Sequence, residues 1–413
     1  MIVDYADLGC TEIINSARAS VYAEKYCLLT SCEPCPGLPE AINDEPYVDP
    51  VTDPAPWYDP AVPESAQFLG VMGLTVSGYS QSTRSRDPQQ LVGDGAALGV
   101  ARRAHREITY TVLLLVLDEC ALSYAMEWLS AALQGAPCEG SCTGDELGVF
   151  ACCPTGDGTR ELRHLYGVGL MAGPELATAR YLEEGIIAEV TFTLAASVPW
   201  IYREPLQTLT DWVSLAAGTP VTLDPDEVYG ECLEATPCLE DPECPPPLLP
   251  VRAPVPVDPC YPTGEDDFYR SVLSLSPVDQ PGWLEAVPVL ELETGGSALR
   301  RLIVRFWANP LGSDCMDVAD PCAACTDIQI PYLPPGATLR VDGRTQRAEV
   351  DCPQGPLGSS TSAPTLYGPL GRSFEWPIFS CPTGLCIEIL STEATTAADA
   401  RARVLLVPRS DVG

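Results

Sequence analysis

A chain of 413 residues with 46% apolar residues exceeds the size at which one hydrophobic core stops growing, so two domains are expected. Its net charge of −34 excludes the extended basic face that nucleic acid or an anionic membrane surface would require. The first residues lack the basic and apolar regions of a secretory signal, and the longest apolar run, Val112–Leu117, is too short to span a bilayer. These features predict a protein that is made in a cytoplasm and does not enter a membrane.

The first 205 residues predict strands accompanied by helices. Asn15 is a suitable cap for a helix over Ser16–Lys25. Alternating residues within Arg102–Asp118 predict the main strand of this block. A helix over Ala121–Leu133, ended by Gly135, is expected to cover one face of the sheet. Further strands are expected at 68–76, 147–152, 162–171 and 186–202.

Two acidic segments interrupt the apolar patterns. Residues 33–64 hold eight acids and no base, and residues 224–267 hold twelve acids, eleven prolines, four cysteines and one base, Arg252. Proline and repelling carboxylates keep such segments extended, which predicts solvated connections. Cation binding is the alternative, because carboxylates are hard oxygen ligands. The four cysteines favour a disulfide-stapled spacer in the second segment.

The remaining residues predict a β-sandwich, because many short strands alternate with turn residues. Val341-Asp342-Gly343-Arg344 predicts a tight hairpin with a type I′ turn. The predicted fold class is therefore mainly β: an α+β domain over 1–205 with one covering helix, an acidic Pro/Cys-rich connection over 206–262, and a sandwich over 263–413.

The chain contains nineteen cysteines, an odd number, so at least one lacks a disulfide partner within the chain. Two C-x-x-C pairs lie in different predicted domains, which argues against one shared zinc site. Disulfides within local clusters are favoured, with a structural zinc site or unpaired thiols as alternatives. The candidate disulfide cysteines are Cys10, Cys27, Cys32, Cys35, Cys138, Cys142, Cys152, Cys153, Cys232, Cys238, Cys244, Cys260, Cys322 and Cys325.

No catalytic signature is present: the sequence has no G-x-S-x-G elbow, no Walker loop and no H-E-x-x-H. We therefore expect neither an enzyme nor a required cofactor or metal. Trp283, Trp307 and Trp376 are candidates for a glycan-facing surface, since aromatic rings offer apolar area to sugars, and core or interface anchoring is the alternative.

Several runs resemble the distal tail proteins, or minor tail proteins, of siphovirus-type actinobacteriophages. The runs are Ala55-Pro-Trp-Tyr-Asp-Pro60, Arg106-Glu-Ile-Thr-Tyr-Thr-Val112, Glu127-Trp-Leu129, Val190-Thr-Phe-Thr-Leu194, Pro199-Trp-Ile-Tyr202 and Pro335-Gly-Ala-Thr-Leu-Arg-Val-Asp-Gly-Arg344. None of these runs is a catalytic signature. The cysteine content and the two acidic segments depart from the family pattern.

The resemblance implies a structural virion protein at the tail tip, synthesised in the host cytoplasm. It implies a ring, usually a hexamer, formed by the N-terminal domain, with a galectin-like C-terminal sandwich pointing outward. The implied partners are the tail tube protein, the tape measure protein and the tail-tip or hub protein, and no nucleic acid or membrane is expected. Ring closure requires self-contacts, for which Arg102, Arg103 and Arg106 are the candidates. The alternative function is a carbohydrate-binding adhesin whose C-terminal sandwich recognises host cell-wall glycan.

Overall fold

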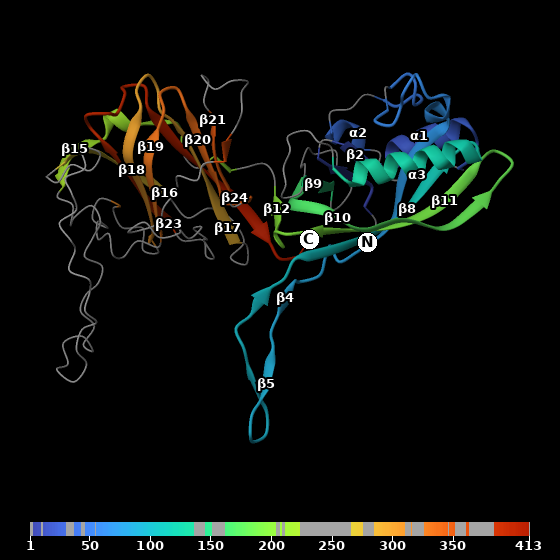
Figure 1. Ribbon diagram of the computed structural model, residues 1–413, viewed down its shortest axis with the longest axis horizontal. Helices are drawn as coiled ribbons and strands as arrows, with labels where there is room; N and C mark the ends of the chain where they lie inside the picture. The colour runs from blue at the N-terminus through green and yellow to red at the C-terminus, as the bar shows by residue number, and fades with distance from the viewer. Residues whose placement is uncertain are drawn as a thin grey trace. The chain divides into compact units, whose positions relative to one another are not determined.

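The computed structural model (Figure 1) confirms the mainly β class and divides into two compact units, residues 1–205 with 408–413 and residues 206–407. The structure describes residues 3–9, 11–29, 37–42, 46–53, 55–135, 145–150, 162–203, 207–208, 211–223, 266–275, 285–309, 315, 326–345, 347–351, 361–362 and 384–412. None of the helices in these ranges has the length and apolar character needed to cross a bilayer.

The first unit combines three α-helices with long and short strands. Its elements are β1 (Tyr5–Leu8), β2 (Thr11–Asn15), α1 (Ser16–Lys25), α2 (Leu38–Ala41), the 3-10 helix η1 (Pro63–Gln67), β3 (Phe68–Ser77), β4 (Arg84–Ser85), β5 (Pro88–Gln90), β6 (Ala96–Leu98), β7 (Arg102–Arg103), β8 (Arg106–Val116), α3 (Glu119–Leu133), β9 (Asp145–Phe150), β10 (Leu162–Tyr181), β11 (Ile186–Ala196) and β12 (Ile201–Arg203).

Side-chain caps fix where the two longer helices begin. The Asn15 side chain accepts a hydrogen bond from the Arg18 backbone N–H at 2.9 Å, as the predicted cap requires. Asp118 accepts from the Ala121 backbone N–H at 2.8 Å, so α3 begins at Glu119, two residues before the predicted start. Both helices were correctly placed by the sequence because a cap and an apolar stripe are local signals.

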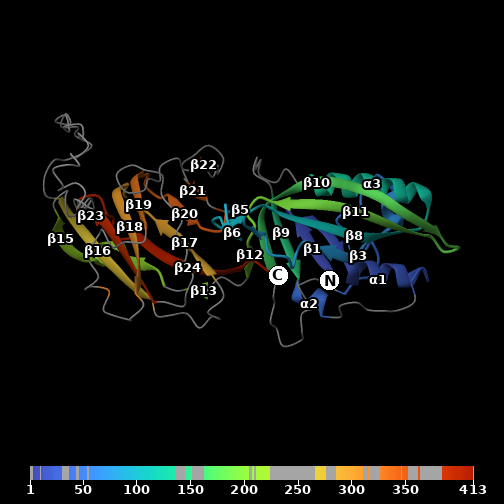
Figure 2. The same ribbon diagram turned by 90° about the horizontal axis from the view of Figure 1, so that it is seen from below.

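A four-stranded antiparallel sheet with the order β3–β8–β11–β10 forms the centre of the first unit. Alternate residues of β11 are buried, and α3 lies along that side of the sheet (Figures 1 and 2). Tyr110 of β8 stacks on Phe192 of β11 with ring centroids 5.3 Å apart. The first residues of β10 instead pair with β9 and β12, and β9 continues to β1 and β2.

The second unit contains two sheets that enclose one core. One sheet has the order β15–β16–β23–β18–β19, and the other has the order β24–β17–β20–β21–β22 with β13 and β14 also paired to β24. Their bounds are β13 (Gln207–Thr208), β14 (Val213–Ser214), the 3-10 helix η2 (Leu215–Ala217), β15 (Thr219–Leu223), β16 (Asp266–Leu275), β17 (Glu285–Glu293), β18 (Leu299–Asn309), β19 (Thr326–Leu333), β20 (Thr338–Asp342), β21 (Arg347–Asp351), β22 (Thr361–Ser362), β23 (Gly384–Thr392) and β24 (Arg401–Ser410). Buried leucine, isoleucine and valine side chains from both sheets meet between them.

The hairpin between β20 and β21 differs from the predicted one. Asp342 pairs with Arg347, so four residues separate the strands, and Gly343 does not adopt a positive φ. The predicted type I′ turn is therefore wrong. The buried Asp342 carboxylate holds the wider turn instead, accepting from the Arg344 backbone N–H at 2.8 Å and from its guanidinium.

Candidate assembly surface

The four-stranded sheet of the first unit leaves one face uncovered. Antiparallel pairing places Thr75, Thr111 and Thr191 side by side across three strands, and Glu175 continues the row on β10. These side chains are exposed or half-buried, so no described element packs over them. We call this side the open face; its polar members are Thr75, Ser77, Glu107, Thr109, Thr111, Glu175, Thr178, Arg180, Glu189, Thr191 and Thr193.

Hydrogen bonds between neighbouring side chains order the open face. The hydroxyls of Thr109 and Thr193 lie 3.0 Å apart, and Thr178 donates to Glu189 at 3.4 Å. Threonine suits this position because its branched side chain packs well on a pleated surface while presenting a hydroxyl. The result is a surface of hydroxyls and carboxylates, interrupted by half-buried Leu113 and Ile187, on a sheet whose other side is a hydrophobic core.

The β10 edge of this sheet exposes residues that belong to the core side. Leu176 pairs with buried Val190, and Tyr181 pairs with buried Ile186, so both side chains point to the side that α3 covers. Nevertheless Leu176 is 48% exposed and Tyr181 63% exposed. Within the described ranges, no strand pairs with β10 beyond Val168 on the side away from β11. An unpaired edge with apolar side chains is a template for strand addition.

The opposite edge of the sheet is β3, where Leu74, Thr75 and Ser77 are exposed while Val76 is buried. Among the described residues β3 pairs only with β8, and Leu74 is 37% exposed. The two edges carry different sequences, so a contact between the β10 edge of one copy and the β3 edge of another would be head-to-tail.

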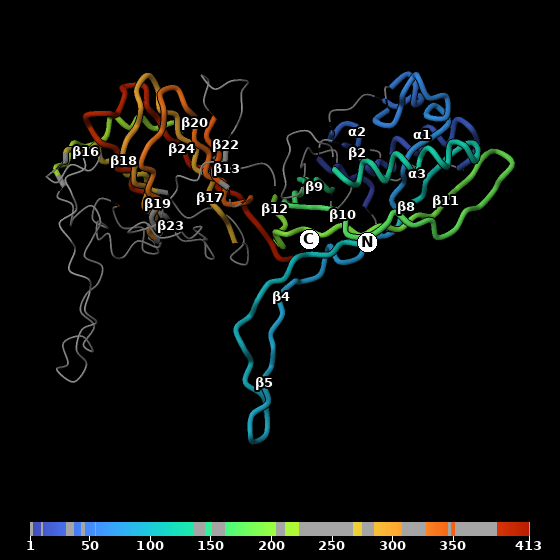
Figure 3. Tube along the Cα trace, viewed as in Figure 1, coloured from blue at the N-terminus to red at the C-terminus, as the bar shows by residue number. Residues whose placement is uncertain are grey.

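A hairpin leaves the sheet between β3 and β8 (Figure 3). We call residues 80–104 the arm; β4 pairs with β7, and β5 pairs with β6. Its apolar side chains are exposed, with Leu98 at 69% and Val100 at 84%. An isolated two-stranded ribbon without a core is marginally stable in water, so the arm is suited to packing against a partner.

The arm is also the basic part of an acidic molecule. Four arginines and two aspartates give it a charge of +2, which leaves −36 for the rest of a chain of net charge −34. Residues of the arm are exposed along almost its whole length. An acidic protein surface is therefore an electrostatically complementary partner for it.

The three predicted interface arginines differ in their exposure. Arg102 is exposed on β7, and Arg103 is half-buried with its guanidinium carbon 4.0 Å from the centre of the Trp200 ring. Arg106 is 1% exposed, which contradicts its assignment to an intermolecular surface. Its guanidinium donates to backbone carbonyls of three chain segments of the same unit, which meet where β8 begins.

Most candidate disulfide cysteines lie outside the described residues. Cys27 is described, and it is an exposed free thiol rather than a bridged one, as is Cys120. The remaining candidates all lie outside the described ranges: Cys10, Cys32, Cys35, Cys138, Cys142, Cys152, Cys153, Cys232, Cys238, Cys244, Cys260, Cys322 and Cys325.

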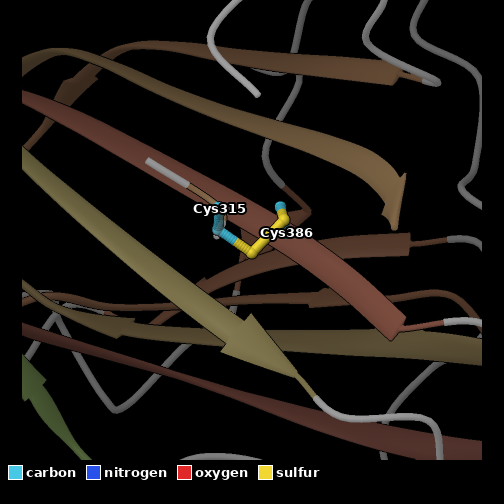
Figure 4. Close-up of a disulfide and its surroundings, with 2 residues drawn as sticks. All are labelled: Cys315 and Cys386. Carbon is cyan, nitrogen blue, oxygen red and sulfur yellow. A yellow bond between two sulfur atoms is a disulfide. The ribbon is translucent and has the colours of Figure 1, made fainter. Parts of the chain in front are cut away.

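The disulfide that the structure describes joins Cys315 to Cys386, residues that were not candidates (Figure 4). Both are buried and separated by 71 residues, so no local cluster in the sequence signals the pair. Trp307 packs against this disulfide and is 3% exposed, so its ring is a core anchor and not a glycan-facing surface. Trp283 and Trp376 lie outside the described residues.

Within the described part of the chain, no group of three or more His, Cys, Asp or Glu side chains is arranged to hold a metal ion. The acidic residues of the open face are spread along three strands and do not converge.

The sequence matches no protein-family profile and no curated protein. Among solved structures it is similar to the Dit protein of phage SPP1, described as a hub of the adsorption apparatus in phages that infect Gram-positive bacteria. That similarity has a TM-score of 0.41 and 12% identity, and covers 84% of this chain and 95% of the other. A chain of the phage P2 baseplate, in its activated conformation with calcium, gives a TM-score of 0.40 with 11% identity, covering 83% of this chain and 92% of the other. At TM-scores and identities this low, the solved structures do not establish what this chain does.

Proposed function

We propose that this protein is a structural component of a phage tail tip that assembles with copies of itself into a ring, with six as the expected number. The sequence runs that resemble distal tail proteins motivate the proposal. The observation that carries it is the four-stranded sheet with one open polar face and two unlike exposed edges.

Head-to-tail pairing of the two edges explains why core-side residues are exposed. If the β10 edge of each copy meets the β3 edge of the next, Leu176 and Tyr181 become buried. Unlike edges give a heterologous contact, which closes into a ring when the rotation between copies is suitable. The backbone groups along both edges would then also be satisfied.

The same arrangement gives the open face a purpose. Edge-to-edge pairing continues the sheet from copy to copy, so the side opposite α3 lines the inside of the ring while the helices stay outside. Hydroxyls and carboxylates remain hydrated in a water-filled channel, and short side chains leave it wide.

The arm supplies a second contact between neighbours. Its exposed apolar residues and its charge of +2 suit a neighbouring copy whose surface is acidic. Tail tube, tape measure and hub proteins remain the proposed partners of the assembled ring, and the virion tail tip remains the proposed location. The C-terminal sandwich stays the proposed galectin-like outer domain.

The alternative, a glycan-binding adhesin, has lost one of its three candidate residues with the burial of Trp307. A glycan array probed with the full chain tests it directly. Specific binding that survives in a non-assembling variant would favour the adhesin.

The mass of the purified chain in solution tests the ring. We expect a species of about six times the chain mass of 44.2 kDa. Leu176→Lys should yield a folded monomer, because the edge would then carry a charge where apolar burial is required. Val51→Lys is the matched control: Val51 is 50% exposed and lies outside the sheet, so the ring should persist. A wild-type chain that stays monomeric at high concentration would overturn the proposal.

A further inference from the structure

The feature that carries a further inference is the junction between the arm and the end of strand β24. We call residues 78–83 and 102–106 the arm root, and residues 409–411 the latch segment. We propose that the latch segment locks the arm root and that Asp411 is the positioning residue that fixes the direction in which the arm leaves the sheet. Only the consequence for assembly rests on the proposed ring.

Arg106 is the centre of this junction. Its Nη1 donates to the carbonyls of Gly78, Tyr79 and Gln81 at 3.1, 2.9 and 2.7 Å. Its Nε donates to Pro199 at 3.0 Å, and its Nη2 donates to the Asp411 carbonyl at 2.6 Å. A guanidinium carries its donors in a fixed planar fork, so the three chain segments are held in one geometry.

The Asp411 side chain reaches the other side of the root. Its carboxylate accepts hydrogen bonds from the Ser82 hydroxyl, from the Thr83 hydroxyl at 3.2 Å and from the Thr83 backbone N–H at 3.3 Å. The same carboxylate lies 3.7 Å from Nη2 of Arg106. Asp411 therefore contacts the two residues directly before β4, whereas Arg106 holds earlier residues of the root.

The latch segment is itself anchored. Arg409 pairs with Tyr202, and Ser410 pairs with Ile201 of β12. The guanidinium carbon of Arg409 lies 3.8 Å from the centre of the Trp200 ring, and that of Arg103 from the arm root lies 4.0 Å from it. Guanidinium–indole contacts of this kind stabilise partly desolvated sites. Asp411 thus acts from a fixed position rather than from a loose end.

The arm cannot fix its own direction. Its root strands β4 and β7 pair over two residues each, and a single further backbone bond joins Ala104 N–H to the Thr83 carbonyl at 3.3 Å. Such a short ribbon has no core, so its direction depends on contacts of its root with other segments. Arg106 holds Gln81 and Trp200 contacts Arg103, while Asp411 is the residue that binds Ser82 and Thr83, next to β4.

Hydrogen bonds to Asp411 hold the pKa of its carboxylate below the ordinary value. Burial would raise its pKa, but hydrogen bonds from Ser82 and Thr83 and the charge of Arg103 outweigh burial, so the pKa lies below the ordinary value. A depressed pKa means that the stabilisation is present above the unfolded-state value and is lost as the pH falls through the folded-state value. The lock should therefore hold at neutral and mildly acidic pH and release only in strong acid.

Hydrogen exchange of the full chain tests the lock. In Asp411→Ala, the amides of the arm root should exchange about tenfold faster than in the wild type, since a local opening equilibrium loses charge-assisted hydrogen bonds. The tip of the arm, residues 91–98, should exchange as before. Asp94→Ala is the matched control, because it removes the same charge from the exposed tip.

A second pair of substitutions makes the test specific. Ser82→Ala with Thr83→Val removes the donors while keeping the carboxylate, and should produce the same acceleration. Combining all three substitutions should accelerate exchange little further, since the two variants break the same interaction. Unchanged root exchange in Asp411→Ala, or full additivity, would overturn the lock.

The outcomes for the lock and for the ring are separable. If the wild-type chain never assembles but Asp411→Ala still accelerates exchange at the arm root, the lock is supported and the ring is ruled out. Normal assembly with root exchange unaffected by Asp411→Ala would support the ring and remove the lock. If both hold, Asp411→Ala should also weaken assembly, with dissociation at several-fold higher protein concentration than the wild type requires.

Discussion

The outward sides of the sheets carry different kinds of side chains in the two units. In the second unit, cross-strand ion pairs cover the sheet surface: Arg403 donates to Glu291 and Arg401 to Glu293, each at 2.6 Å. On the other sheet of that unit, Glu388 lies between Arg270 and Arg305. The open face of the first unit carries threonines and glutamates instead.

The difference lies in whether the described charges of a sheet find their partners on the same sheet. Opposite charges on neighbouring strands stabilise each other, so these ion pairs of the second unit are satisfied within one copy. The sheet of the first unit leaves core-side apolar residues exposed at its β10 edge.

The largest expected effect is at Glu388. Its side chain is 8% exposed and lies 2.5 Å from Arg270 and 3.3 Å from Arg305. Glu388→Gln should lower the free energy of unfolding by about 3–5 kcal/mol, because the buried Arg305 guanidinium and the half-buried Arg270 guanidinium lose their counter-charge. Glu293→Gln, at a side chain that is 34% exposed, should cost less than about 1 kcal/mol. Denaturant unfolding measures both, and equal losses would show that burial does not distinguish these pairs.

An intermediate effect is expected for the exposed ion pairs of the second unit. A double-mutant cycle with Arg403→Ala and Glu291→Ala should give a coupling energy of about 0.5 kcal/mol, since the pair is partly solvated. The coupling should shrink further at high salt. A coupling near zero at low salt would mean that Arg403 and Glu291 are solvated separately and do not stabilise each other.

The smallest effect is expected on the open face. Thr109→Val with Thr193→Val removes both hydroxyls of a bonded pair and keeps the branched shape. The free energy of unfolding should change by less than about 0.5 kcal/mol, because neither partner is left unsatisfied. A loss well above that value would show that the open face stabilises the single copy, as the ion pairs do in the second unit.

Local signals in the sequence were sufficient for much of the fold. Asn15 and Asp118 cap helices through bonds that span three residues, and the alternation around Thr109 and Thr111 is that of a half-buried strand. That Leu176 of the β10 edge lies on the core side of the sheet could be recognised only from its pairing with Val190, which the sequence does not show.

The features that escaped prediction depend on distant partners. Arg106 reads as one of several arginines near a strand, and its burial requires carbonyls from residues 78–81, 199 and 411. The arm is rich in Gly, Gln, Ser and Arg and shows no alternation, so its sequence reads as a loop. Cys315 and Cys386 become neighbours only once the sandwich has formed.

The contact between Arg106 and Asp411 spans 305 residues of sequence, and this has a consequence for synthesis. At a translation rate of about 5–20 residues per second, the first unit waits roughly 15–60 s between the emergence of one partner and that of the other. During that interval the nascent chain has an arm with an unfinished base. Copies still on the ribosome would then assemble poorly. Ring growth would be delayed until residue 411 has emerged, which favours subunits translated at least that far.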